Sequence, residues 1–232
     1  MIKKFCYIDT ETTGLDPIKN GIHEISGAIV IDGQQKEEFE FKISPFPSDE
    51  IEDKALEIAK VTRDQIMSYE EPLETHNRLI EILGRYVDKF DKTDKFWFVA
   101  YNSPFDKEFM RSWFEKCGDK YFGSWFRLDI CVMRVAIHRL LLKNVQLDNY
   151  KLSSVAQHLG IAEPDDERWH SSKFDIYVTR EILKRVSVWS PTIPAPDSTA
   201  NFFKMRSMYC WVSISIFICH FIIRKIEVAL YY

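Results

Sequence analysis

The sequence predicts an α/β fold, a mixed β-sheet of about five strands with helices on both faces. Three strand-like runs come first, within residues 5–43, and short apolar runs then alternate with helical patterns as far as residue 188. The chain has 232 residues, 46% of them hydrophobic, so it is long enough to bury a sizeable core. We therefore expect one α/β domain over residues 1–188, followed by an appendage.

The first three strands are expected to form an antiparallel meander. Residues 5–10 are mostly apolar and rich in aromatic and β-branched side chains, as in a central strand. Asp32 and Gly33 separate the next two extended runs, and this dipeptide is a strong hairpin signal. In the second of these runs, Phe39 and Phe41 alternate with charged residues, so one face should meet water at the edge of the sheet.

Helices and two further strands should complete the domain. Thr62 starts a capping-box pattern, and Pro72 is typical of the first turn of a helix. Gly118 and Gly160 are placed to end helices. The expected strands are residues 96–100 and 125–128, and the expected helices are residues 105–117, 130–142, 152–159 and 174–188.

The composition changes after the domain. Proline, serine and threonine cluster within residues 189–203, as in a linker, and an apolar tail occupies residues 204–232. The apolar stretch at residues 208–223 is shorter than the roughly 18 to 20 residues of a comfortable membrane span. A membrane-associated tail is therefore the less favoured expectation. Docking on the domain, homodimerisation and no selected role are the alternatives.

Charge and cysteine content narrow the class of protein. A formal net charge of −4 gives no basic footprint of the kind that a DNA-coating protein shows, although a carboxylate site attracts phosphate once it binds divalent metal. The five cysteines are odd in number and lack C-x-x-C spacing, which argues against a disulfide framework or a zinc site. The N-terminus lacks the apolar core of a signal peptide. We expect a reduced, cytoplasmic protein.

Two acids stand at the end of the first strand, in the segment YIDTETTGLD at residues 7–16. Asp9 and Glu11 are two positions apart, so an extended chain projects both from one side. Holding both charged at the end of a buried strand is costly unless a cation neutralises them. The pair suggests a metal site with hard oxygen ligands, and the alternative is a strand end that is acidic by chance.

Three more residues occupy comparable places on later elements. Asp106 follows the apolar run 96–100 and opens a helix, where its alternative role is to stabilise the helix dipole. Asp175 falls on the apolar stripe of the last helix, where a buried charge needs a metal or a salt bridge. His170 reaches the same site only if it precedes that helix. It is then a candidate general base, although a lone histidine is more often structural.

Together, four carboxylates and one histidine describe a two-metal site for phosphoryl transfer. Two divalent ions about 3.5 to 4 Å apart would hold a scissile phosphate between a water molecule and the leaving 3′ oxygen. Oxygen ligands favour Mg²⁺, with Mn²⁺ as a substitute, over zinc. The turn after Glu11 would bring backbone amides to the terminal nucleotide.

These motifs resemble those of the DnaQ-like exonucleases of the DEDD superfamily, in the branch called DEDDh. The matching segments are DTETTGL at 9–15, HEI at 23–25, NSPFD at 102–106, and His170 with Asp175 at that branch's spacing. Further stretches extend the resemblance over about residues 1–188. The resemblance implies a ribonuclease H-like fold and metal-dependent removal of nucleoside 5′-monophosphates from a 3′ end.

The resemblance also implies residue roles. The implied ligands of two Mg²⁺ ions are Asp9, Glu11, Asp106 and Asp175, and the implied general base is His170. The implied contacts to the terminal nucleotide are Thr12, Thr13, Gly14, Leu15, Asn102 and Phe105. Leu15 would be a wedge against the terminal base. Apolar and aromatic wedges suit single strands, since every base offers a stacking face.

The sequence departs from the family pattern and leaves the substrate open. Tyr101 stands where many members have histidine, and Ile176 stands where alanine is frequent. Single-stranded DNA is favoured over RNA, because the resemblance is to proofreading and repair members, and a polymerase is a candidate partner. The alternatives are an exoribonuclease and a catalytically silent nucleic-acid-binding module. The intact set of acids argues against the silent module.

Overall fold

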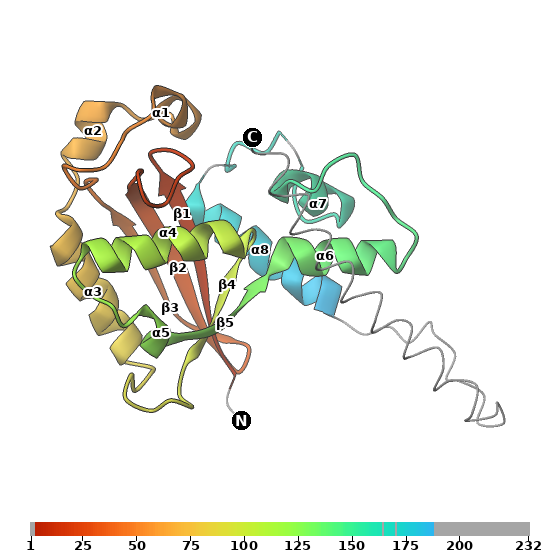
Figure 1. Cartoon of the computed structure of the whole chain (residues 1–232). Coiled ribbons are helices and arrows are strands. Elements are labelled where there is room, and N and C mark those ends of the chain that lie inside the picture. The colour runs from red at the N-terminus through yellow and green to blue at the C-terminus, as the bar shows by residue number, and fades with distance from the viewer. Residues whose placement is uncertain (1–2, 164, 170, 188–232) are drawn as a thin grey trace, which may run out of the picture. The chain divides into compact units, whose positions relative to one another are not determined.

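The computed structural model describes residues 3–163, 165–169 and 171–187. The expected linker and apolar tail lie outside these residues. The described strands are β1 (Lys4–Thr12), β2 (Ile22–Ile31), β3 (Gln34–Lys42), β4 (Phe96–Ala100) and β5 (Phe126–Cys131). They form one sheet in the order β3-β2-β1-β4-β5 (Figure 1). The first three strands are antiparallel and the last two run parallel to β1, which confirms the predicted mixed sheet and its meander.

Helices cover both faces of this sheet, as predicted. The described helices are α1 (Asp53–Ala59), α2 (Arg63–Met67), α3 (Pro72–Gly84), α4 (Ser103–Lys116), α5 (Phe122–Trp125), α6 (Val132–Leu141), α7 (Leu152–His158) and α8 (Ser172–Ser187). Apolar side chains of α3, α4 and α5 build one core cluster with the sheet. Side chains of α6, α7 and α8 build a second cluster on the opposite face. In Figure 1, α4 crosses in front of the sheet and α8 passes behind it.

The predicted hairpin joins β2 to β3. Asp32 and Gly33 have φ values of 49° and 83°, and a two-residue turn with both residues at positive φ fits the twist of the strands it joins. On β3, Phe39 and Phe41 are buried and stack with ring centroids 5.6 Å apart. The charged residues that alternate with them, Glu38, Glu40 and Lys42, are exposed. The alternation therefore marks β3 as the edge strand that the sequence predicted.

Several boundaries differ from the expected ones. Trp125 ends the short helix α5 instead of starting a strand. Residues 129–131 pair with residues 98–100 of β4, so β5 extends to Cys131 and α6 begins two residues later than expected. The parallel pairing to β4 provides backbone hydrogen bonds that a helical pattern in the sequence does not reveal. The helix α4 begins two residues early, since Pro104 is tolerated in the first turn.

The alternation of side chains along β1 decides which residues reach each face. Cys6 and Ile8 belong to the core cluster under α3 and α4, whereas Tyr7 belongs to the cluster under α8. Asp9 and Glu11 follow Tyr7 at steps of two residues, so they lie on the α8 side of the sheet. The strand thus directs both acids toward the helix that carries Asp175.

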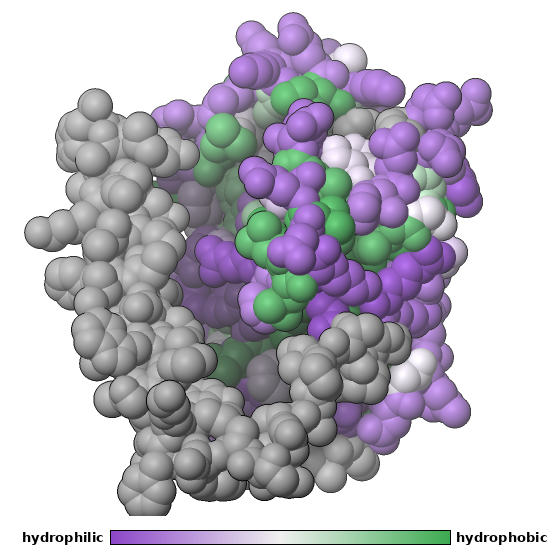
Figure 2. All heavy atoms as spheres, turned by 90° about the vertical axis from the view of Figure 1, so that its right-hand side faces the viewer, coloured by the Kyte–Doolittle hydropathy of each residue, from purple (hydrophilic) through white to green (hydrophobic). Residues whose placement is uncertain are grey.

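Figure 2 shows the side of the domain that carries α6. Hydrophobic residues lie there among hydrophilic ones. Leu141 and Leu142, at the end of α6, are exposed by 52% and 59%. Among the described helices, none is long and apolar enough to cross a membrane.

One buried histidine gives the domain a pH dependence. His23 on β2 is 2% exposed, and neither of its ring nitrogens has a hydrogen-bond partner among the described residues. Burial lowers the pKa of His23 to about 4. The folded protein therefore binds this proton less readily than the unfolded chain does, so the stability associated with neutral His23 is present above about pH 6.5 and is lost as pH falls toward 4.

We predict that His23→Leu reduces this acid sensitivity. The difference between the melting temperature of the variant and that of the native chain should become more positive as the pH is lowered from about 7.5 to about 4.5. The free energy of unfolding that depends on this histidine is up to roughly 3 kcal/mol. Thermal unfolding followed by circular dichroism measures this difference. His138→Leu, at an exposed histidine on α6, is the matched control. A relative melting temperature for His23→Leu that is equal at both pH values contradicts the assignment.

Candidate active site

The carboxyl end of β1 gathers acidic residues from three elements. On β1 itself, Asp9 lies opposite Ser26 of β2, and Glu11 lies opposite Glu24. Side chains at directly opposed positions of an antiparallel pair are close neighbours. The register between β1 and β2 shifts just after Glu11, so the strand bulges where the acids end and the turn begins.

Asp106 approaches the same strand end from the first turn of α4. The side chain is 6% exposed, and its Oδ1 accepts hydrogen bonds from the backbone N–H and the hydroxyl of Thr10, at 3.1 and 2.9 Å. These two bonds tie the start of α4 to the middle of the Asp9–Glu11 segment. The carboxylate is therefore held by β1 rather than left to cap its own helix.

Asp175 comes from the first turn of α8. Val178, Ile182 and Val186 are buried at successive turns of this helix, as the predicted stripe requires. Asp175 shares their face, and its Oδ1 is buried with no hydrogen-bond partner among the described residues. The helix begins at Ser172, so position 170 precedes it in the chain. His170 itself lies outside the described residues.

Burial and mutual repulsion raise the pKa values of these acids. The pKa of Asp9 is raised well above its ordinary range by burial first, and then by Asp106, Glu11, Asp175 and Glu24. Burial, together with Glu24, Asp175 and Asp106, raises the pKa of Glu11 to about 7. Burial raises the pKa values of Asp106 and Asp175 to about 7 as well. Asp9 and Glu11 therefore lie close enough to the other carboxyl groups to sense their charge.

This arrangement fits divalent cations. The ligand atoms would all be carboxylate oxygens, which Mg²⁺ and Mn²⁺ prefer. The unpartnered Oδ1 of Asp175 is an acceptor that a cation could satisfy. Within the described part of the chain, no group of three or more acidic, histidine or cysteine side chains is arranged closely enough to hold a metal ion as it stands. The chemistry of the donor set therefore supports Asp9, Glu11, Asp106 and Asp175 as the residues that would hold metal.

A cavity of about 390 Å³ adjoins the acids. It is lined by Thr10, Glu11, Thr12, Gly14, Leu15, Glu52, Lys54, Ala55, Ile58 and Phe105. Leu15 from the turn and Ile58 from α1 are exposed by 79% and 59%. Phe105 is half-buried and packs against Phe109, with ring centroids 4.7 Å apart. The cavity thus places apolar side chains directly beside Glu11.

The turn after β1 is held by buried hydrogen bonds. Thr13 is fully buried, and its hydroxyl donates to the backbone oxygen of Glu50 while it accepts from the N–H of Gly21. A Cβ atom on Gly14 would lie 2.3 Å from Glu52 Oε1 and 2.4 Å from the buried Asn20 side chain, so a larger residue there would force both side chains to move. These contacts fix the direction in which the next residue, Leu15, projects.

Some of the residues predicted to contact the nucleotide line the cavity, and others do not. Thr12, Gly14, Leu15 and Phe105 line the cavity. Thr13 does not, because its side chain is buried under the turn. Asn102 is exposed just before α4 and does not line the cavity either. Thr13 therefore supports the turn. The four residues that line the cavity form the wall that a ligand would meet.

Two features of the site were missed in the sequence. Glu24 raises the pKa of both Asp9 and Glu11, and it accepts a hydrogen bond from the Ser172 hydroxyl at the start of α8. The signal was the antiparallel register, which sets Glu24 opposite Glu11. Lys54 and Ile58 of α1 line the cavity, and both fall in a helical segment whose pattern alone gave no reason to choose them.

Tyr101, where the family pattern often has histidine, has a structural partner. Its hydroxyl donates to the backbone oxygen of Tyr150 at 2.6 Å, which joins the end of β4 to the segment before α7. Burial raises the pKa of the Tyr101 hydroxyl, so the group stays a neutral donor. The departure at this position thus adds a tie between the sheet and the α7 region.

The fold resembles that of solved exonucleases. E. coli exonuclease I in complex with a dT13 oligonucleotide aligns with a TM-score of 0.65 and 18% identity, over 79% of this chain and 41% of that chain. A product-bound structure of exonuclease I aligns with a TM-score of 0.63 and 18% identity, over 79% and 43%. At these identities the likeness shows a shared ribonuclease H-like exonuclease fold.

Sequence relatives point the same way. The PolC-type DNA polymerase III chains of Thermotoga petrophila and Thermotoga maritima are each 32% identical to this chain over 181 residues, which are 78% of this chain and 12% of the polymerase. This chain thus spans a small part of the relatives that it matches. The model of the RNase T family, described as exonuclease, matches residues 6–183. That match covers most of the sequence, and the chain therefore belongs to the RNase T exonuclease family of the DEDD superfamily.

Proposed function

We propose that this protein is a metal-dependent 3′–5′ exonuclease of the DEDDh type. It hydrolyses the last phosphodiester bond at the 3′ end of single-stranded nucleic acid, with DNA favoured, and releases nucleoside 5′-monophosphates. The observation that carries the proposal is the meeting of Asp9, Glu11, Asp106 and Asp175 beside an apolar cavity. Membership of an exonuclease family supports the reaction class.

The acids supply the binding site for two Mg²⁺ ions, with Mn²⁺ as a substitute. When bound, such ions would stabilise the negative charge that develops on the scissile phosphate. The protein's own part is to hold four carboxylates in place. The Thr10 hydrogen bonds fix Asp106, the β1 backbone fixes Asp9 and Glu11, and the buried stripe of α8 fixes Asp175. His170, two residues before the start of α8 in the sequence, takes the proton from the attacking water in this proposal.

The cavity orients the terminal nucleotide. Leu15 projects from a rigid turn, and Phe105 and Ile58 add apolar surface, so a base stacks without sequence preference. The exposed lining residue Lys54 provides a positive charge for the phosphate backbone. An apolar wedge favours a frayed or single-stranded end, because a base that is not held in a stacked duplex can leave its neighbour and present a face to the wedge.

DNA is favoured on the strength of the relatives. The matching polymerases are DNA polymerases by name, and the solved exonuclease I complex contains a dT13 oligonucleotide. The same relatives make a DNA polymerase the candidate partner, since this chain corresponds to a short part of each polymerase. RNA remains a second substrate class that the same carboxylates would serve.

We predict metal-dependent release of mononucleotides from the 3′ end of a single strand. Matched DNA and RNA strands, labelled at either end, are incubated with Mg²⁺, Mn²⁺ or EDTA. The Asp9→Ala variant should lose turnover while it keeps its fold, because removing one carboxylate relieves repulsion in the metal-free site. Release by the variant at the native rate, or release from the 5′ end, counts against the proposal. Release from RNA alone would reassign the substrate.

We predict that Leu15→Ala raises KM for single-stranded DNA several-fold and leaves kcat nearly unchanged, because Leu15 contacts the terminal base rather than the reacting atoms. Steady-state kinetics on a 3′-labelled strand measure both constants. Ile18→Ala is the matched control, since Ile18 is 81% exposed in the same turn and lies outside the cavity lining. Equal effects of the two substitutions would remove the wedge role.

We predict that Asp106→Asn stabilises the metal-free protein above neutral pH. Burial raises the pKa of Asp106 to about 7, so the stability that its protonated form provides is lost as pH rises from about 4 through 7. In EDTA at about pH 8, the melting temperature of the variant should exceed that of the native chain, by roughly 2–4 °C for each kcal/mol. At about pH 5 the difference in melting temperature between the two proteins should be smaller.

In the same experiment, Mg²⁺ should make the melting temperature of the native chain the higher of the two. It binds the native carboxylates and so raises the melting temperature of the native chain, whereas the variant lacks one ligand and gains less. Circular dichroism melts with and without Mg²⁺ measure both gains. An equal gain in the two proteins would show that Asp106 does not hold the ion.

A further inference from the structure

A second cavity lies at the opposite end of the sheet from the acids. It has a volume of about 600 Å³ and is lined by Lys89, Phe90, Lys92, Lys95, Tyr121 and Ser124. Residues 89–95 precede β4, and β4 runs parallel to β1, so this cavity lies toward the amino ends of these strands, whereas Asp9 and Glu11 lie at the carboxyl end of β1. The proposed reaction does not use any of these residues.

The lining is basic. Its three charged residues are all lysines, and among the described residues it contains no acid. The nearby acids are not part of the lining: Asp94 pairs with Lys4, and Asp91, which stays ionised, accepts hydrogen bonds from the N–H and hydroxyl of Thr93. Lys95 donates to a backbone oxygen in α5, while Lys92 is exposed. The cavity therefore favours an anionic ligand.

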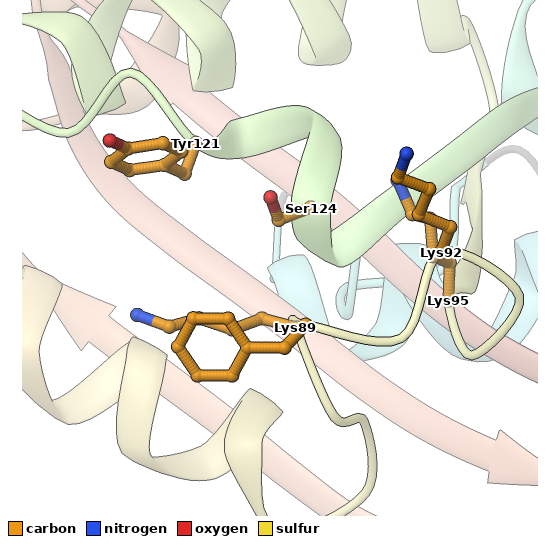
Figure 3. Close-up of a pocket in the computed structure, with 6 residues that line it drawn as sticks. Lys89, Lys92, Lys95, Tyr121 and Ser124 are labelled. Atoms are coloured by element: carbon orange, nitrogen blue, oxygen red, sulfur yellow. The ribbon is translucent and has the colours of Figure 1, made fainter.

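The lining is also aromatic. Phe90 is 85% exposed and Tyr121 is 67% exposed, which is unusual for side chains of this size. The ammonium group of Lys89 lies 5.3 Å from the centre of the Phe90 ring. Figure 3 shows Tyr121 and Lys89 on two sides of an open space, with Lys92 and Lys95 together at another side and Ser124 between. Aromatic faces and ammonium groups thus border one space.

We propose that this cavity binds a nucleotide segment of single-stranded nucleic acid at a distance from the reacting end. Lysines near a phosphate backbone and exposed rings that stack on bases are the two components of sequence-tolerant single-strand binding. The hydroxyls of Tyr121 and Ser124 add donors for phosphate oxygens. The proposal rests on the proposed substrate class, and it adds a second contact that only a long strand can use.

An acidic peptide fits the cavity less well. Peptides that bind in extended form gain affinity from backbone hydrogen bonds to an open strand edge. The lining residues come from the segment before β4 and from Tyr121 and α5, not from a described strand. Stacking on two exposed rings requires flat partners, which every nucleotide supplies.

Binding of labelled strands by the full-length protein tests the proposal. A 5′-fluorescein strand of about 30 thymidines is titrated in EDTA, and fluorescence anisotropy gives Kd. The pocket variants are Phe90→Ala with Tyr121→Ala, and Lys92→Glu. The control variants are Leu142→Ala and Lys143→Glu, which change an exposed apolar residue and an exposed lysine at the end of α6. We expect each pocket variant to weaken binding about fivefold or more, and the controls to have no effect.

Two further readouts define the site. The slope of log Kd against log salt concentration should fall in magnitude by about one for Lys92→Glu beyond its control. Hydrolysis of a dinucleotide in Mg²⁺ should be unchanged in the pocket variants, because so short a substrate does not reach the cavity. KM for the long strand should rise in the same variants.

Three results overturn the proposal. One is an unchanged Kd for the long strand in the pocket variants. Another is an equal loss of hydrolysis of the dinucleotide and of the long strand, which would mean a general defect in the enzyme. The third is pocket-dependent binding of a labelled acidic peptide without binding of the oligonucleotide. Pocket-dependent strand binding by a protein that releases no mononucleotides would support this site while it refutes the exonuclease.

Discussion

The crowding of like charges at the carboxyl end of β1 is the constraint on which the rest of the structure depends. Five carboxyl groups lie where burial raises their pKa values, and each ionised acid makes ionisation of the next more costly. Such a cluster persists only because rigid elements hold it. The sheet fixes Asp9, Glu11 and Glu24, while α4 and α8 deliver Asp106 and Asp175 on helices whose apolar faces are buried. Packing energy thus stabilises an arrangement that electrostatics opposes, and a cation reverses the sign of the electrostatic term.

The wall beside the acids follows from the same strand. The bulge after Glu11 shifts the register with β2, where Thr12 pairs with Ile22, and the buried Thr13 hydroxyl then fixes the turn from below. Leu15 is exposed because its neighbours are not free to rearrange around it. Leu15 differs from the equally exposed Ile18 of the same turn in that it lines the cavity, so it is the residue that the proposed terminal base would cover. The proposed metal ligands Asp9 and Glu11 and the proposed base contact Leu15 therefore lie on one continuous segment.

Sequence reasoning predicted most of the fold because the relevant signals are local. The Asp32-Gly33 turn, the alternation of Phe39 and Phe41, and the apolar run of β4 each identify their element without knowledge of the rest. The limits of β5 and α6 were misjudged, because pairing with β4 extends the strand to Cys131 and no local pattern reports that partner.

The candidate site divides along the same line. Asp9, Glu11, Asp106 and Asp175 could be chosen from strand and helix positions, since alternation and the helical stripe say which way each side chain points. Glu24 required the register between two strands, and Ile58 required the packing of α1 over the turn. The sequence also predicts Thr13 and Asn102 as nucleotide contacts, and only the three-dimensional arrangement shows that Thr13 is buried under the turn and that neither residue lines the cavity.

The position of β1 in the middle of the sheet has a consequence for synthesis of the chain. Residues 22–31 can pair with one side of β1 almost as soon as they leave the ribosome, but its other side waits for β4, where Tyr7 pairs with Val99. Until then the nascent meander presents an apolar strand with unsatisfied backbone groups, which invites pairing with another chain. The lysines at positions 3 and 4, at the start of that strand, place charge on this temporary edge. A nascent chain that ends before residue 96 therefore lacks the strand that covers this edge of β1.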